Sequence, residues 1–166
     1  MNDIMQWLPK ILEDGVWAAV AAVGFAIMFN APCRSLLACA IVGALGHALR
    51  FFLLEALDFS IVPATLTAAV VIGFLAKELA RRHELPSLIY SIVGAIPMVP
   101  GAYAFRTMIG LLQLAGGLVT IDNSFNLSYL MARTLQNGIL TALILGALAV
   151  GITAPTLLFE RHKPVV

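Results

Sequence analysis

The sequence predicts an all-α fold, a polytopic membrane protein of about five transmembrane helices whose fourth helix is broken at Pro97-Gly101. Of the 166 residues, 61% are hydrophobic and 11% charged, whereas soluble domains average about 45–50% apolar and about 25% charged residues. The mean hydropathy is +0.97. Apolar runs long enough to cross a bilayer, about 20 residues each, recur between short links. This composition excludes a soluble globular domain, and we expect residues 1–166 to form a single transmembrane domain.

The first 14 residues have an amphipathic pattern. Apolar side chains follow helical i, i+3, i+4, i+7, i+8 spacing, namely Ile4, Trp7, Leu8, Ile11 and Leu12. We expect residues 1–14 to form an interfacial helix anchored by Trp7, residues 15–158 a helical bundle, and residues 159–166 a cytoplasmic tail. The alternative is a frayed extension of the first spanning helix. Asp3, Glu13 and Asp14 occupy the region where a signal peptide is basic, so we expect the first helix to remain in the mature protein.

Three spanning helices are predicted in the first half of the chain. The first covers about 16–29 and ends before Pro32, because proline disfavours helical geometry at the preceding residue. The second covers about 34–54. The third covers about 61–79 and has Pro63 in its first turn, where a missing N–H costs least. Cys33 and Cys39 are interpreted as buried small apolar residues, since two thiols cannot complete a structural zinc site.

The fourth apolar segment, 87–118, is too long for a single straight span. Its 32 residues would extend about 48 Å, against a hydrocarbon core of about 30 Å. Pro97, Pro100 and Gly101 supply a break about 15–21 Å from Ser87, near the midplane. The second half-helix would then present unpaired N–H groups and a positive dipole end, which suit a carboxylate. The alternative is a proline kink that serves packing. A fifth helix over about 127–158 is long enough to tilt.

Basic residues outside the spans segregate to one side of the predicted bundle. These are Arg34, Lys77, Arg81, Arg82, Arg161 and Lys163, whereas the opposite side carries Lys10 alone together with several acids. Cytoplasmic loops are enriched in lysine and arginine. We therefore place the N-terminus outside and the C-terminus in the cytoplasm.

Three arginines, Arg50, Arg106 and Arg133, lie inside apolar spans, where each costs about 2.5–3.5 kcal/mol on insertion scales. The predicted topology places all three in the outer half of the bilayer. Glu55 is the obvious carboxylate partner there, so an anionic substrate would supply the remaining counter-charge. The alternative is that these side chains snorkel to the headgroups.

Two further polar side chains lie in the spans. His47 is one turn from Arg50 and is a candidate proton-coupling group, because imidazole titrates near neutral pH; a hydrogen-bonded packing role is the alternative. Asn137 is expected to hydrogen-bond across helices, and Asn30 to cap one. The sequence contains no nucleophile with a suitably spaced base and no phosphate loop, so we expect no enzyme, no catalytic residues, no cofactor and no metal site. An odd helix number argues against a complete inverted-repeat transporter in one chain, so we expect a partner.

Several segments resemble one known family. They are Gly24-Phe25-Ala26, Phe29-Asn30-Ala31-Pro32 with Arg34, Gly46-His47 with Arg50, Ile96-Pro97-Met98-Val99-Pro100-Gly101, and Asn137. Together they resemble the small, YjjB-like subunit of the threonine/serine exporter family over nearly the whole chain. The Pro-Met-x-Pro-Gly element is the most specific part. Arg106 and Arg133 lie outside the family pattern.

The resemblance implies a transporter subunit in the bacterial inner membrane, acting with a larger YjjP-like subunit to export small carboxylates. Members of the split type suggest a succinate-like dicarboxylate, and fused members suggest threonine and serine. The expected substrate-binding residues are Arg50, Pro97, Pro100, Gly101, Asn137, Arg106 and Arg133, with His47 coupling protons. No nucleic acid partner is expected. A non-transporting scaffold for the larger subunit is the alternative from another class.

Overall fold

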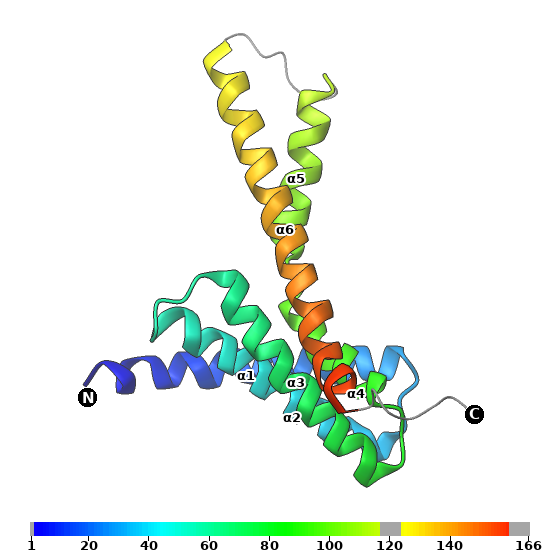
Figure 1. Cartoon of the computed structure of the whole chain (residues 1–166). Coiled ribbons are helices and arrows are strands. Elements are labelled where there is room, and N and C mark those ends of the chain that lie inside the picture. Colours follow the sequence, from blue (N-terminus) through cyan, green and yellow to red (C-terminus); the bar gives the residue numbers. More distant parts are fainter. Residues whose placement is uncertain (1, 117–123, 160–166) are drawn as a thin grey trace. The chain divides into compact units, whose positions relative to one another are not determined.

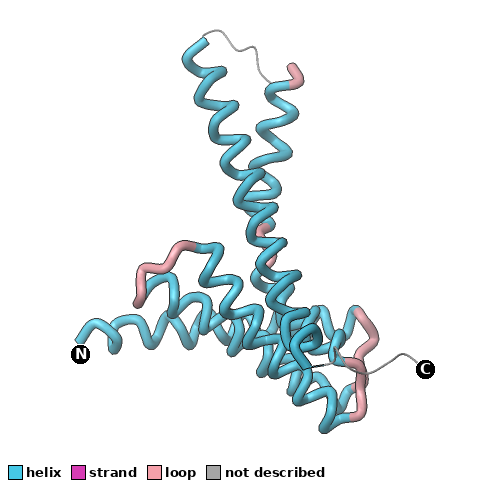
Figure 2. Tube along the Cα trace, in the orientation of Figure 1, coloured by secondary structure: helices cyan, strands magenta, loops and turns pink. Residues whose placement is uncertain are grey.

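A computed structural model describes the backbone of residues 2–116 and 124–159, and the side chains of 7–116 and 127–158. The helices are α1 (Asn2–Met28), α2 (Leu36–Glu55), α3 (Ile61–His83), α4 (Ser87–Ala95), α5 (Gly101–Leu114) and α6 (Ser124–Phe159). Two short 3-10 helices, η1 (Cys33–Ser35) and η2 (Ile96–Met98), precede α2 and follow α4. The described ranges contain helices and loops and no strand (Figure 2). The all-α prediction is therefore confirmed.

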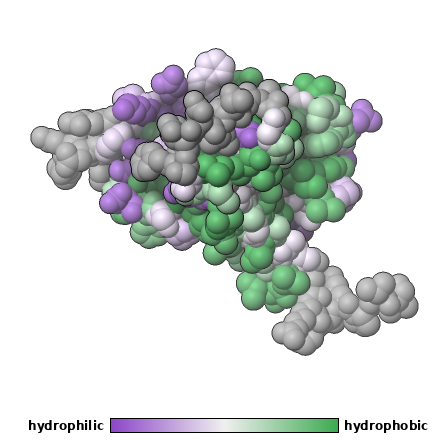
Figure 3. Space-filling model, turned by 90° about the horizontal axis from the view of Figure 1, so that it is seen from above, coloured by the Kyte–Doolittle hydropathy of each residue, from purple (hydrophilic) through white to green (hydrophobic). Residues whose placement is uncertain are grey.

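The spanning helices also agree with the prediction. Within the described residues, four helices are long and apolar enough to cross a membrane, or five if the bent pair Ser87–Met98 and Gly101–Leu114 is counted as one broken span. Large apolar side chains such as Trp17, Leu37 and Phe105 are exposed, and Figure 3 shows broad hydrophobic areas on the face it presents. Such a surface suits lipid contact. The orientation of the termini stays a prediction.

The helix boundaries differ from the expected ones mainly at the start of the chain. α1 is continuous from Asn2 through Pro9 to Met28, so residues 2–14 extend the first spanning helix, as the alternative interpretation had it. Their placement at the membrane interface stays a prediction. Apart from the backbone of Phe159, the expected tail at 159–166 lies outside the described residues.

The end of α1 shows why the chain turns before Pro32. Asn30 has a φ of 57°, and the Ala31 N–H donates to the Ala26 carbonyl while the Asn30 N–H donates to the Ile27 carbonyl. This is a Schellman motif, in which asparagine tolerates the left-handed conformation. The predicted capping role of Asn30 is confirmed. Cys39 is buried as expected, but Cys33 is exposed in η1, because the turn carries it away from the helix contacts.

The chain forms two compact units. The first contains α1 to η2 and the part of α6 that begins at Ala147. In this unit α1 lies along α2, and α2 also contacts α3 and α4. Small residues allow the close approach: a Cβ added at Gly43 would lie 2.6 Å from the Cβ of Ala22, and one at Gly151 would lie 3.0 Å from the Val70 backbone nitrogen.

The second unit covers Val99–Gly146 and consists mainly of α5 and the first part of α6. These helices run side by side (Figure 1). Gly110 of α5 faces Thr134 of α6, where an added Cβ would lie 2.9 Å from the threonine Cβ. Gly138 of α6 faces Thr107 of α5 in the same way, at 3.4 Å from its Cγ2. The two glycines thus allow the close spacing of α5 and α6.

Candidate functional site

The predicted break lies between η2 and α5. Pro100 has φ and ψ of −80° and 56°, and the Gly101 N–H donates to the Val99 carbonyl at 2.8 Å. These values describe an inverse γ-turn. Because this turn already uses the Gly101 N–H, that group is not available to a carboxylate in this conformation.

The donors at the start of α5 are therefore the next two amides. The Ala104 N–H donates to the Pro100 carbonyl at 3.0 Å. Among the described residues, the N–H groups of Ala102 and Tyr103 have no backbone acceptor, as expected for the first turn of a helix. The predicted positive end of a half-helix is thus present, and two of its N–H groups remain for a ligand or for water.

Arg50 contacts the other side of the break. Its Nη1 donates to the carbonyl of Met98 at 2.9 Å, and Met98 is fully buried at the end of η2. A buried carbonyl needs a hydrogen-bond donor, and the interrupted helix does not supply one there. The Arg50 side chain therefore holds the end of η2 against α2 within the first unit. The sequence predicts a carboxylate such as Glu55 as the partner, whereas the contact at Met98 is with a backbone carbonyl.

His47, one turn earlier on α2, pairs with a residue that the sequence did not indicate. Its Nδ1 lies 2.5 Å from Oδ2 of Asp14 on α1, and the two side chains are 23% and 30% exposed. A first span that begins at residue 16, as predicted, leaves Asp14 outside the membrane. A span beginning at Trp7 would have placed a carboxylate inside an apolar helix, where such groups have partners.

The remaining predicted residues gather in the second unit. Arg106 and Arg133 line one pocket of about 210 Å³ together with Asn137, Gln113 and Thr134. The guanidinium of Arg133 lies 5.2 Å from the ring centroid of Tyr129, a cation–π contact. Within the described part of the chain, the Arg106 guanidinium has no hydrogen-bond or ion-pair partner. The pocket thus offers positive charge and amide groups in an otherwise apolar hairpin.

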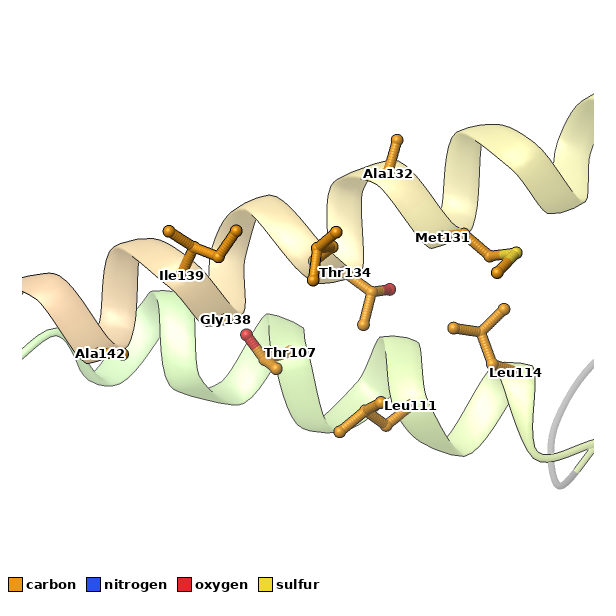
Figure 4. Close-up of a pocket in the computed structure, with 10 residues that line it drawn as sticks. Thr107, Leu111, Leu114, Met131, Ala132, Thr134, Gly138, Ile139 and Ala142 are labelled. Carbon is orange, nitrogen blue, oxygen red and sulfur yellow. The ribbon is translucent and has the colours of Figure 1, made fainter.

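A second pocket of this hairpin is larger and apolar. It measures about 530 Å³ and is lined by Thr107, Leu111, Leu114, Met131, Ala132, Thr134, Leu135, Gly138, Ile139 and Ala142. Figure 4 shows Leu114 and Met131 pointing toward one another at one end of it. It contains no charged side chain, so it has nothing to balance a carboxylate, and the smaller pocket is the better candidate for an anion.

The predicted site residues therefore fall into two groups. His47, Arg50 and Pro97 belong to the first unit, and Pro100, Gly101, Arg106, Arg133 and Asn137 to the second. In the structure, Arg106, Arg133 and Asn137 line one pocket. Asp14 is a hydrogen-bond partner of His47 that the sequence did not indicate. The common depth of the three arginines stays a prediction. Among the described residues, no group of three or more histidine, cysteine or acidic side chains could hold a metal ion.

Comparisons with known proteins agree with this description. A family model described as "Threonine/Serine exporter, ThrE" matches residues 14–158. An uncharacterized protein of Haemophilus influenzae is 40% identical over 158 residues, which cover 95% of this chain and 50% of that protein. The chain thus spans about half the length of this relative. No solved structure matches the chain.

Proposed function

Because this chain belongs to the threonine/serine exporter family, we propose that it is one subunit of a secondary transporter that exports small carboxylates across the bacterial inner membrane. We further propose a succinate-like dicarboxylate as the substrate and a larger YjjP-like membrane protein as the partner. Half of the Haemophilus relative lies outside the matched region. The additional length of that relative supports a function that requires more protein than the helices of this chain.

The pocket between α5 and α6 carries the substrate proposal. Arg106 and Arg133 line a pocket of about 210 Å³ together with Gln113 and Asn137. Guanidinium groups bind carboxylates through charge-assisted, often bidentate hydrogen bonds. A dicarboxylate supplies two negative charges, whereas serine or threonine brings an ammonium group that two arginines repel. Threonine or serine remains the second candidate, because the family description names both amino acids.

Efflux of labelled succinate from cells that lack and then regain both subunits tests this assignment. We expect Arg106→Ala and Arg133→Ala each to lower efflux by about tenfold or more, since a hydrogen bond to a charged group contributes about 1.5–3 kcal/mol. Arg106→Lys should retain part of the activity. Arg81→Ala is the control, because this exposed arginine pairs with Glu78 at the end of α3.

Two results would contradict the proposal in different ways. Unchanged succinate efflux in both alanine variants would exclude the pocket as the binding site. Full-rate efflux from the larger subunit alone, once stably inserted, would instead assign this chain the role of a scaffold. Preferential efflux of labelled serine or threonine by the pair would replace the substrate while keeping the exporter.

A further inference from the structure

We infer that Asp14 and His47 form the proton-carrying pair of this transporter, with Asp14 as the positioning residue for the imidazole. The inference rests on the proposed export function, and it adds a residue that the family resemblance did not include. It also identifies the route by which a proton could affect the broken segment.

Small residues lie at the contact between α1 and α2 near this pair. A Cβ added at Gly15, next to Asp14, would lie 3.6 Å from the Ala44 carbonyl and 3.7 Å from the Cβ of Ala48. The two helices are therefore close on either side of His47. An acid inside an apolar interface carries a desolvation cost that packing alone does not offset. Ionisable residues inside a membrane usually pair with one another, and such pairs commonly belong to proton or ion pathways.

The pair can gain and lose a proton without breaking its hydrogen bond. With Nδ1 facing the carboxylate, the neutral imidazole donates Nδ1–H to Asp14 and leaves Nε2 as the basic nitrogen. A proton that binds Nε2 gives an imidazolium, which still donates through Nδ1. The net charge of the pair then changes from −1 to 0. The same proton leaves from Nε2, so the cycle balances.

Other titratable residues lie on the helices that pack against α2. On α1, Lys10 lies one turn before Asp14 and its ammonium lies 5.1 Å from the Trp7 ring centroid. Titratable residues of α3 begin at Lys77, about one and a half turns beyond Ile72, which meets Gly46. Tyr90, the titratable residue of α4, hydrogen-bonds to His83, and η2 has no titratable residue.

α2 connects this pair to the break. His47 and Arg50 are three residues apart and lie on the same helix face. His47 contacts α1, and Arg50 contacts the Met98 carbonyl at 2.9 Å. A change in the charge of the pair alters the field at Arg50 and the attachment of α1 to α2. We therefore expect proton binding and carboxylate movement to be energetically coupled.

Reconstituted vesicles that contain both subunits allow coupling and transport to be measured separately. We expect Asp14→Asn and His47→Gln to lower efflux driven by an imposed pH gradient by about tenfold, within the usual range of coupling energies, and to flatten its pH profile. Exchange of labelled for unlabelled succinate without a gradient should persist. Asp14→Glu should restore much of the driven efflux, and Glu13→Gln, at the exposed neighbouring carboxylate, should match the unmodified protein.

An unchanged pH profile in Asp14→Asn would overturn the inference. So would an equal loss of exchange and driven efflux that Asp14→Glu does not restore, since that pattern indicates a structural role. If the unmodified pair of subunits shows no exchange, the proposed function fails. Nitrogen NMR of the His47 imidazole then still tests whether Nε2 is the nitrogen that binds the proton. We expect Nε2 to titrate while Nδ1 stays protonated, and Asp14→Asn to change the tautomer; titration at Nδ1 would contradict the assignment.

Discussion

At the scale of single residues, several polar side chains in the apolar helices have a specific neighbour or gather in a pocket. Arg50 binds a backbone carbonyl, His47 binds Asp14, and Arg106 and Arg133 line a pocket. Each charged group in an apolar helix raises the free energy of insertion, so the contact that compensates it indicates its role. The contact of Arg50 stabilises the fold, whereas Arg106 and Arg133 line a pocket that has space for a ligand.

Arg50 is therefore predicted to affect stability as well as transport. We expect Arg50→Ala to lower the free energy of unfolding in detergent by about 1.5–3 kcal/mol, because it removes a charged donor and leaves the buried Met98 carbonyl without it. Arg82→Ala, which breaks an exposed pair with Glu78 at 2.8 Å, is the matched control and should change stability little. Thermal unfolding of the purified variants measures both, and equal stability of the two variants would contradict the assignment.

The sequence indicated which polar residues lie in the apolar helices, but it did not predict all of their partners. Hydropathy identifies Arg50 and His47 because each interrupts an apolar run. It cannot show that Asp14, 33 residues from His47, faces it, because that pairing depends on how α1 lies along α2. The Met98 carbonyl could not be predicted as a partner either, since the residue type does not show which backbone carbonyls need a donor.

At the scale of elements, proline and asparagine positions predicted several of the helix ends. The turn before Pro32, the start of α3 near Pro63 and the break at Pro97 to Gly101 all follow from restrictions on backbone geometry. The start of α1 did not follow, because Glu13 and Asp14 were interpreted as a boundary. A helix can continue through such a pair when one carboxylate has a partner on the next helix.

The packing of α1 on α2 gives a direct test at this scale. We expect Gly43→Ala to destabilise the protein by about 1–3 kcal/mol, because the added Cβ would lie 2.6 Å from the Ala22 Cβ and neither atom can rotate away. Gly24→Ala is the control, since no atom lies within 4 Å of its added Cβ. Alanine there should be neutral or stabilising by about 0.5–1 kcal/mol. Unfolding in detergent would measure both, and a tolerated Gly43→Ala would contradict the close contact.

At the scale of the whole molecule, the charge distribution predicts how the chain inserts. The bundle has Lys77, Arg81 and Arg82 near the end of α3, and Lys10 near the start of the chain. We expect a C-terminal fluorescent fusion to be active and a C-terminal phosphatase fusion to be inactive, because basic loops stay in the cytoplasm.

Variants of the basic residues test whether their charge sets the orientation of the chain. Replacing Lys77, Arg81 and Arg82 together by alanine should raise the phosphatase activity of the C-terminal fusion, since the charge bias that sets orientation is reduced. Lys10→Ala should leave the activity unchanged. Phosphatase activity in the unmodified fusion would reverse the predicted topology while leaving the helical fold intact.

The exposed turn at Cys33 has a practical consequence for following this protein at work. The chain has two cysteines, one exposed in η1 and one buried in α2, so the natural sequence already provides a single reactive thiol. A spin label or fluorophore at that position, with Cys33→Ser as the blank, would report the environment of the α1–α2 turn without any engineered site. The same label would show whether this turn changes its surroundings when protons or carboxylates are supplied.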